Sequence, residues 1–351
     1  MRSSSHGEIV EGNFRGVNGK GMKLRFHKKR LQLRETFSIA YGNYNFRDAL
    51  LIGLSYLDQK GFGECVSINY YGINLEKFIL KLKEIQSRIE NHSIVHPKEF
   101  FVFLNSLNLH SFLLSALDCA YWDLYGKLEN QSFAELNSLK NDNLVESSFT
   151  ISIADIETQI QKMEKSSWNT FKVKCGEFNQ NDFEKLVKSG FSISLDANAS
   201  FKEDDCTWIQ QNIDSQRINY FEQPLEIGEF QVLDSKKYAN WMADEDAQNV
   251  DILEKLQPHY SSINIKLMKC GGLTPALSFI AKAKQLGFKV MLGCMTESSV
   301  GISAGCALAG LLEYADLDGA NLISNDYAKG SFVENGKIIL SEKPGLGISL
   351  L

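Results

Sequence analysis

Residues 170–174 read TFKVK and residues 193–198 read ISLDAN, and in both segments charged side chains follow a short apolar run. The same pattern recurs downstream at YFEQP (220–224), WMADE (241–245), INIK (263–266) and YADLD (314–318). Successive charges are 22 or 26 residues apart as far as Lys266, and the 52 residues from there to Asp318 span two such steps. This period fits one strand plus one helix, and charges at the carboxyl ends of successive strands form the active site of a (β/α) barrel. The sequence therefore predicts a barrel enzyme.

Eight short strands are predicted from the second part of the chain, with helical stretches between them. The strands are expected at residues 148–153, 171–175, 192–197, 220–224, 241–245, 262–268, 289–294 and 314–320. Strands that alternate with helices in this way indicate a parallel sheet, and eight of them favour a closed barrel. We expect an α/β barrel domain over residues 146–327.

The flanking regions follow other patterns. Residues 22–145 alternate as short strands and then show helical spacing, which predicts an α+β domain. Residues 328–351 are predicted to form a hairpin turning at Asn335 and Gly336, and to return to the N-terminal domain. Residues 1–21 are rich in Gly, Ser and Asn and have no apolar h-region, so we expect a flexible leader or tag.

Composition excludes some classes of partner. The chain has 351 residues and a net charge of −6, without a basic stripe, so nucleic acid is not an expected partner. It contains no apolar run of ~18 residues, so no membrane span is expected. The seven cysteines are scattered and form no CxxC pair, which predicts reduced thiols and a cytoplasmic location.

Three carboxylates end consecutive predicted strands: Asp196, Glu222 and Asp244. Taken alone, each fits a helix N-cap or a surface charge, but three at matching positions favour a metal site. Oxygen ligands without nearby His or Cys suit Mg²⁺. Asn198 lies two residues past Asp196 and is expected to hold a metal-bound water or a ligand carboxylate.

Lysines precede and follow these carboxylates. Lys172 and Lys174 are two residues apart, so both project from one face of their strand. Lys266 lies four strands further on, which is the opposite wall of an eight-stranded barrel. We expect burial and a neighbouring ammonium to lower the pKa of such lysines, as a base near neutral pH requires. Two lysines facing each other across Mg²⁺ could move a proton between the faces of a carbon next to a carboxylate.

These motifs resemble the muconate-cycloisomerase-type branch of the enolase superfamily, and within it the dipeptide epimerases. The resemblance rests on GFGE (61–64), SALDCAYWDLYGK (115–127), KVK (172–174), DAN, EQP and ADE at the three carboxylates, NIKLMKCGG (264–272) and PGLG (344–347). It implies a modified TIM barrel, (β/α)7β, with an α+β capping domain. It also implies an isomerase acting on a dipeptide through an enediolate, with Lys174 and Lys266 as the acid/base pair and Lys172 as a third catalytic candidate.

The narrower assignment rests on DLD, because an Asp-x-Asp at this position in dipeptide epimerases binds the substrate's ammonium. The candidate substrate-binding residues are Asp316, Asp318, Glu297, Thr150, Asn198, Tyr41, Tyr44 and Tyr70. In Ala-Glu epimerases of the family, an arginine in the first capping loop binds the side-chain carboxylate. Residues 36–46 contain neither Arg nor Lys, and the nearest is Arg47. We therefore expect an apolar pocket, lined by these tyrosines with Phe46 and Tyr71, and a preference for hydrophobic or small dipeptides.

Other functions share parts of this pattern. An o-succinylbenzoate synthase, an N-acylamino-acid racemase or a cycloisomerase would use the same lysines and carboxylates on substrates without a free ammonium. A catalytically inactive, metabolite-binding homologue would be expected to lose some of them. A metal-dependent hydrolase barrel usually needs histidines at strand ends, and none of the six is placed there. The oligomeric state is left open, a homo-oligomer included.

Overall fold

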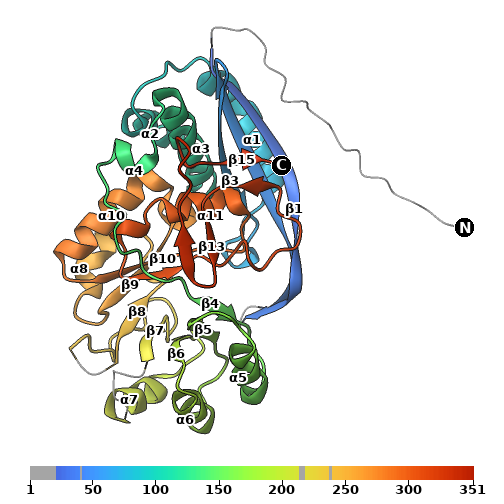
Figure 1. Cartoon of the computed structure of the whole chain (residues 1–351). Helices are drawn as coiled ribbons and strands as arrows, with labels where there is room; N and C mark the ends of the chain where they lie inside the picture. The colour runs from blue at the N-terminus through green and yellow to red at the C-terminus, as the bar shows by residue number, and fades with distance from the viewer. Residues whose placement is uncertain (1–20, 40–41, 213–217, 237–238) are drawn as a thin grey trace, which may run out of the picture.

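The computed structural model describes residues 21–39, 42–212, 218–236 and 239–351. A barrel of parallel strands packs against an antiparallel sheet with its own helices (Figure 1). Each part has a hydrophobic cluster, and the barrel cluster also takes in Phe62 and Trp122 of the N-terminal part, so the two cores meet. The expectation of a leader or tag at residues 1–21 concerns a segment that, apart from residue 21, lies outside the described residues.

The N-terminal region forms a three-stranded antiparallel sheet, in the order β1-β2-β3, that packs on helix α3. Close packing requires glycine here, because a Cβ at Gly63 would lie 2.0 Å from the backbone oxygen of Ala116 in α3. Helix α2 is absent from the sequence-based prediction. The elements are β1 (Lys23–Ile39), β2 (Gly42–Tyr56), β3 (Gln59–Val66), η1 (Asn69–Tyr71), α1 (Leu75–Glu90), α2 (Pro97–Asn105), α3 (Ser111–Glu129) and α4 (Phe133–Leu136).

The eight predicted barrel strands are all present and parallel, in sequence order from β4 to β11. A parallel bridge between Ser147 and Ala315 joins the first strand region to the last and closes the barrel. The predicted α/β fold, a modified TIM barrel with an α+β capping domain, is confirmed. The strands are β4 (Phe149–Ile151), β5 (Thr170–Lys174), β6 (Ser192–Asp196), β7 (Ile218–Glu222), β8 (Trp241–Ala243), β9 (Ser262–Lys266), β10 (Lys289–Gly293) and β11 (Tyr314–Asp316).

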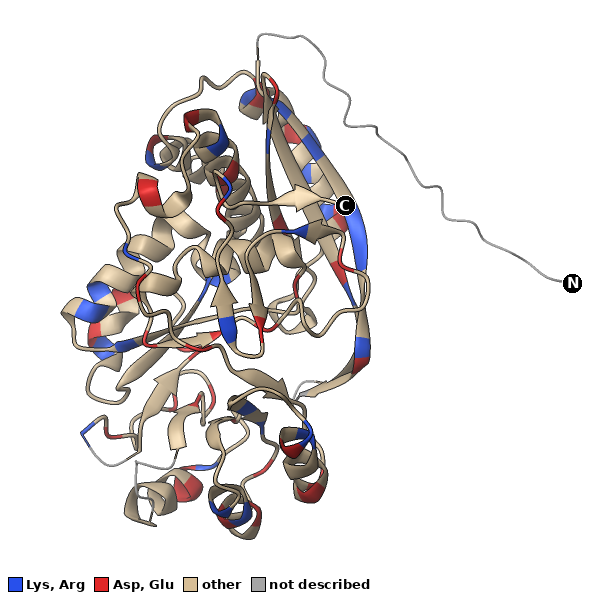
Figure 2. Ribbon diagram, viewed as in Figure 1, with Lys and Arg blue, Asp and Glu red and all other residues tan. Residues whose placement is uncertain are grey.

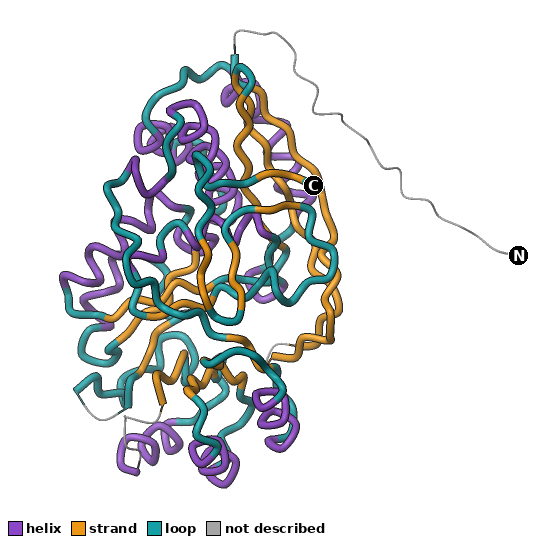
Figure 3. The backbone as a smooth tube through the Cα atoms, in the orientation of Figure 1, coloured by secondary structure: helices purple, strands orange, loops and turns teal. Residues whose placement is uncertain are grey.

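Helices follow the outside of the barrel strands (Figure 3). The connection from β7 to β8 is different, since its described residues form turns and no helix. Pro224 and Gly228 in this segment disfavour a helix. The connecting elements are α5 (Ile156–Glu164), α6 (Gln180–Lys188), α7 (Glu203–Asn212), η2 (Val250–Ile252), α8 (Leu253–Leu256), α9 (Leu267–Cys270), α10 (Leu273–Gln285), α11 (Ser299–Cys306) and η3 (Ala309–Leu311).

Strand alternation explains why lysines point into the barrel. In β5, Phe171 and Val173 are fully buried in the hydrophobic cluster shared with the surrounding helices. Their neighbours Lys172 and Lys174 must then face the other side of the sheet, which is the barrel interior. The apolar residues of this strand therefore fix the direction of its charged ones.

The capping region is attached to the barrel through helix α3. The carboxylate of Asp118 accepts hydrogen bonds from the backbone N and Oγ1 of Thr274, at 2.8 and 2.7 Å, at the start of α10. Trp122 Nε1 donates to the same Thr274 Oγ1 at 2.8 Å. These contacts hold the capping sheet over the carboxyl ends of the barrel strands.

The C-terminal tail also contacts α3, since the backbone N of Leu346 donates to Asp123 Oδ1 at 2.8 Å. The predicted hairpin is present, with positive φ at Asn335 and Gly336 in its turn. The tail strands are β12 (Ala328–Lys329), β13 (Phe332–Glu334), β14 (Lys337–Ile339) and β15 (Ser349–Leu350).

Charges and thiols are distributed as the composition suggests. Acidic and basic residues are interspersed over the outer helices α5, α6 and α8 (Figure 2). All seven cysteines are free thiols. Within the described part of the chain, no helix combines the length and the apolar character needed to cross a bilayer.

Candidate active site

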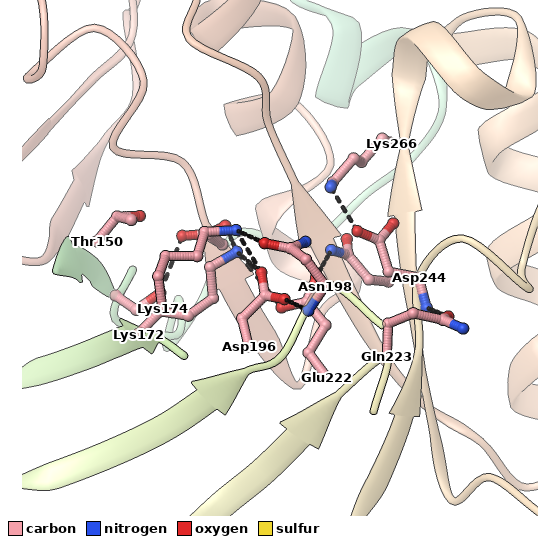
Figure 4. Close-up of polar contacts among 12 residues, drawn as sticks. Thr150, Lys172, Lys174, Asp196, Asn198, Glu222, Gln223, Asp244 and Lys266 are labelled. Atoms are coloured by element: carbon pink, nitrogen blue, oxygen red, sulfur yellow. Dashed lines mark hydrogen bonds and ion pairs between the residues drawn. The ribbon is translucent and has the colours of Figure 1, made fainter. Parts of the chain in front are cut away.

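The predicted row of charges lies at the carboxyl ends of five adjacent strands. Lys172 and Lys174 are in β5, Asp196 ends β6, Glu222 ends β7, Asp244 follows β8 and Lys266 ends β9. The parallel register pairs Lys174 with Asp196, and Asp196 with Glu222. Figure 4 shows the three carboxylates side by side, with the β5 lysines on one flank and Lys266 on the other.

Each outer carboxylate is bound by a lysine. Lys174 Nζ donates to Asp196 Oδ2 at 2.5 Å and to Asn198 Oδ1 at 3.1 Å. On the opposite wall, Lys266 Nζ donates to Asp244 Oδ2 at 2.6 Å. The carboxylate row is therefore flanked by lysines at both ends, Lys174 at Asp196 and Lys266 at Asp244.

The expected lowering of the pKa is not found for Lys172 or Lys266. Burial alone would lower the pKa of Lys172, but the charges of Asp316, Glu222 and Asp196 outweigh it and raise that pKa well above its usual value. Burial alone would also lower the pKa of Lys266, but the charge of Asp244 raises that pKa well above its usual value. The sequence argument considered the second ammonium and missed how closely the carboxylates would approach.

The carboxylates suit a divalent cation in charge and chemistry. All three are fully buried, and burial followed by the charge of Asp196 raises the pKa of Glu222 to about 8. Oε2 of Glu222 has no hydrogen-bond donor among the described residues, although Lys172 Nζ lies 3.4 Å away. Three buried carboxylates that repel one another form an oxygen ligand set for Mg²⁺, which would relieve the repulsion.

The outer two carboxylates of the row are turned toward lysines. Over the described ranges, no three Asp, Glu, His or Cys side chains converge closely enough to enclose an ion. The hydrogen bonds to lysine account for this, because Asp196 is turned toward Lys174 and Asp244 toward Lys266 and Lys269. An entering cation would have to compete with these ion pairs for the carboxylate oxygens.

The two aspartates of the DLD motif line the same cavity as the lysines. Asp316 forms an ion pair with Lys172 and accepts a hydrogen bond from Ser148 Oγ at 3.1 Å. Asp318 Oδ2 accepts from the backbone N of Thr150 at 2.7 Å. Burial, followed by the charge of Asp316, raises the pKa of Asp318 to about 7. Among the described residues, no basic side chain lies within ion-pair distance of Asp318, whereas Asp316 is paired with Lys172. Asp318 is therefore better placed than Asp316 to receive an ammonium.

Glu297 occupies a different position from the other candidates. It is absent from the cavity lining, and its Oε1 accepts from the backbone N of Met295 at 2.7 Å. A Cβ at Gly301 would lie 1.9 Å from its Oε2, so the side chain is held against the first turns of α11. Burial raises its pKa to about 7. These contacts favour a structural role for Glu297, which supports the start of the next helix, over contact with a substrate.

The capping region supplies the outer wall of the cavity. This wall consists of Phe37, Tyr44, Arg47, Ile68, Tyr70 and Tyr71. Phe46 does not belong to it, since it is 43% exposed and lies under the guanidinium of Arg30, 3.9 Å from its ring centre. Tyr41 lies outside the described residues. Besides the aromatic residues, buried Arg47 lines the cavity beside Tyr44, so the wall that was expected to be apolar also carries a cation.

Several supporting residues were missed by the sequence argument. Asn264 Nδ2 donates to Glu222 Oε1 at 2.7 Å, and Gln223 Oε1 accepts from the backbone N of Asp244 at 3.0 Å. Lys269 also pairs with Asp244. The only sequence signal for these residues is that each lies close to a candidate residue. Arg47 was noted in the sequence but was not taken as a candidate, because it lies one residue beyond the first capping loop.

Comparisons with known proteins agree with this geometry. Residues 155–351 match the model of the family described as Enolase C-terminal domain-like. An L-Ala-D/L-amino acid epimerase of Maribacter sp. is 36% identical over 337 residues, covering 94% of this chain and 99% of the relative. Another of that description, from Flavobacterium johnsoniae, is 33% identical over 342 residues, 94% of this chain and 100% of the relative.

Solved structures show the same fold. A dipeptide epimerase from Enterococcus faecalis V583, complexed with Mg and L-Leu-L-Tyr, superposes with a TM-score of 0.84 at 25% identity, over 94% of this chain and all of that one. The fold and the row of strand-end charges define a member of the enolase superfamily, and the chain belongs to it. Because its relatives are epimerases, the chain is assigned to the isomerases.

Proposed function

We propose that the protein is a Mg²⁺-dependent dipeptide epimerase that inverts one Cα by 1,1-proton transfer. The observation that carries this proposal is the placement of Lys174 and Lys266 on opposite walls, with three buried carboxylates between them. A carbon held at this place can lose a proton toward one wall and gain one from the other. That is the requirement for inverting a stereocentre without breaking another bond.

The protons balance between the two lysines. One lysine, as the neutral amine, takes the Cα proton, and the other, as the ammonium, delivers a proton to the opposite face. Exchange with solvent then restores the starting protonation states. Lys172 takes no part in this transfer, because its ion pair with Asp316 keeps it as a fixed positive charge beside the carboxylates.

Asp196, Glu222 and Asp244 are the residues that would hold Mg²⁺. When bound, the ion would stabilise the negative charge that develops on the substrate's carboxylate as the α-proton leaves. The chain's own contribution is to bury these ligands and to orient Glu222 through Asn264. The Mg complexes of structural neighbours support this choice of cation.

The substrate class follows from the second acidic site. Asp318, with Asp316 beside it, offers a negative charge in the same cavity, which suits the free ammonium of a dipeptide. An N-acylated amino acid or a dicarboxylate carries no such cation. The names of the curated relatives support a dipeptide with alanine in first position.

Solvent deuterium exchange tests this proposal directly. The enzyme is incubated with Mg²⁺ in D₂O and a panel of L-Ala-X dipeptides, and ¹H NMR follows the Cα signal of X and the appearance of the second diastereomer. We expect exchange and epimerisation together, and loss of both when EDTA is added and their return with excess Mg²⁺. The Lys174→Ala/Lys266→Ala double variant is the control.

Two outcomes would contradict the proposal. Exchange with N-acetylamino acids but with no dipeptide would identify an N-acylamino-acid racemase, and would remove the role given to Asp318. Undiminished epimerisation in EDTA would remove the metal from the reaction.

A further inference from the structure

Glu64, in β3, is a buried carboxyl group that the proposed reaction does not use. It is only 4% exposed, and no basic side chain lies within ion-pair distance of it in the described part of the chain. Three hydrogen-bond donors meet at this group instead. The backbone N of Ser298 donates to Oε1 at 2.9 Å, Ser298 Oγ donates to Oε2 at 2.7 Å, and Tyr327 Oη donates to the same Oε2.

The three donors explain why a carboxyl group is buried here. Ser298 is the N-cap of α11, and its Oγ already accepts from the backbone N of Val300 at 3.1 Å, so its own proton is directed to Glu64. A carboxylate has two acceptor oxygens, so one such side chain can serve all three donors. Without such partners its burial would be costly, and hydrogen bonds to a charged acceptor are among the stronger ones. Glu64 therefore fastens Ser298 and Tyr327 to the capping sheet.

The two partners of Glu64 belong to different loops of the barrel. Ser298 lies in the loop after β10, whose Met295 and Thr296 line the cavity, and the helix that follows, α11, contacts β3 (Figure 1). Tyr327 follows β11, on the same segment of chain as Asp318. Because β10 and β11 are neighbours in the barrel, Glu64 joins two adjacent barrel loops to one strand of the capping domain.

These two loops pack closely against each other beside the expected ammonium site. A Cβ at Gly319, next to Asp318, would lie 2.3 Å from the backbone oxygen of Met295, so the two backbones are in direct contact there. The backbone oxygen of Asp318 accepts from the backbone N of Asn321 at 2.8 Å, which holds the turn that follows. A shift of the loop after β10 would therefore be transmitted to Asp318.

We propose that Glu64 is a positioning residue, which holds the ammonium site of Asp318 in place by tying the loops after β10 and β11 to the capping sheet. This inference rests on the proposed function, in which Asp318 receives the substrate's ammonium. Glu64 is absent from the cavity lining, so it acts through Ser298 and Tyr327 and not by contact with the substrate. Its loss should weaken the binding of the ammonium and leave the barrel lysines in place.

Two ligands that differ only in the amino group isolate the ammonium site. L-Ala-L-Ala is the substrate, and N-propionyl-L-alanine, which has no ammonium, is measured as a competitive inhibitor. The wild type is compared with Glu64→Ala, Glu64→Gln and Tyr327→Phe, all with saturating Mg²⁺. Glu84→Gln is the matched control, because Glu84 is an exposed glutamate on α1 outside the cavity lining.

We expect Glu64→Ala to raise KM for L-Ala-L-Ala by about tenfold, since it leaves three donors without their acceptor. In the same variant, kcat and the Ki of N-propionyl-L-alanine should each change by less than about threefold, because the lysines and the metal ligands are untouched. Glu64→Gln keeps one acceptor oxygen and should raise KM by only about threefold. Tyr327→Phe should raise KM in the wild type and have no further effect in Glu64→Ala, where its contact is already lost.

Equal increases in KM and Ki would overturn the proposal, because they would mean that Glu64 supports the whole cavity and not the ammonium site. An unchanged KM in Glu64→Ala would overturn it as well. If Glu64→Ala does not fold, Glu64→Gln decides by the same comparison: a rise in KM alone supports the proposal, and parallel or absent changes contradict it.

Failure of the proposed function would look different, since the wild type would then turn over no dipeptide. Calorimetric titration in the presence of Mg²⁺ decides in that case. Selective weakening of L-Ala-L-Ala binding by Glu64→Gln would still support the positioning role. Equal weakening of both ligands, or no weakening of either, would remove it.

Discussion

The two walls of the cavity are built in opposite ways. On the barrel wall, functional side chains project from strands whose register is fixed by the sheet, and each lysine has a carboxylate partner. On the capping wall, aromatic residues and one arginine, which has no carboxylate partner in the described part of the chain, come from the end of a hairpin and from a 3₁₀ turn in another domain. Under the proposed function, the groups that act on the reacting atoms are on the rigid wall, and the groups that would meet a variable side chain are on the other. Three changes test this division, from the largest expected effect to the smallest.

Removing a barrel lysine should have the largest effect. We expect Lys174→Ala or Lys266→Ala to lower the rate of epimerisation by about 10²- to 10⁴-fold, the usual contribution of a positioned acid or base. Each single variant should still exchange the Cα proton of one diastereomer, because the remaining lysine reaches one face. NMR in D₂O, starting separately from each diastereomer, measures this. If either variant exchanged both diastereomers at the wild-type rate, the two-wall mechanism would be wrong.

The second prediction concerns pH and the ammonium site. The pKa of Asp318 is raised to about 7 by burial, so the carboxylate is ionised above that pH and neutral below it. Loss of its charge removes the attraction for the substrate ammonium, and kcat/KM should fall by about tenfold per pH unit as the pH drops below 7. Asp318→Asn should lower kcat/KM at pH 8 and shift or remove this acid limb. An unchanged acid limb in that variant would assign it to another group.

The smallest effect concerns how the capping wall is held. At Gly63 an added Cβ would lie 2.0 Å from the backbone oxygen of Ala116, so Gly63→Ala must push β3 away from α3. We expect a loss of about 1–3 kcal/mol in the free energy of unfolding, as overpacking typically costs. Gly176 is the control, because its Cβ position is open and its φ is not positive. Urea denaturation compares the two variants, and equal stability would show that the sheet and helix can separate at little cost.

The barrel wall could be predicted from the sequence to a large extent. The eight strands, their order of charges and the closing hairpin at Asn335 and Gly336 follow from local patterns, since apolar runs and turn residues act over a few positions. The side of the strand on which Lys172 and Lys174 lie also follows, because alternation is a local property. Their partners did not follow: the sequence gives no distance between Lys172 and Asp316, which are 144 residues apart.

The capping wall was predicted less well. Tyr44 and Phe46 look equivalent in the sequence, but only Tyr44 lines the cavity, while Phe46 packs against Arg30 on the exposed side. Arg47 lies just outside the loop that was taken as the specificity segment, and it reaches the cavity because Ser67 and Tyr44 hold its guanidinium there. Glu297 carries the right chemistry at a strand end, but the contact with the α11 turn holds it outside the lining.

The sequence by itself determined the kind of fold and the inventory of reacting groups, because strand period, alternation and the residue types at strand ends are written locally along the chain. Only the tertiary structure decided how those groups are paired: which carboxylate each lysine meets, which aspartate of the DLD motif has no lysine within ion-pair distance among the described residues, and which arginine reaches the cavity. The reason is physical, since charge, burial and hydrogen bonding depend on separation in space, and the residues concerned come from different strands and different domains.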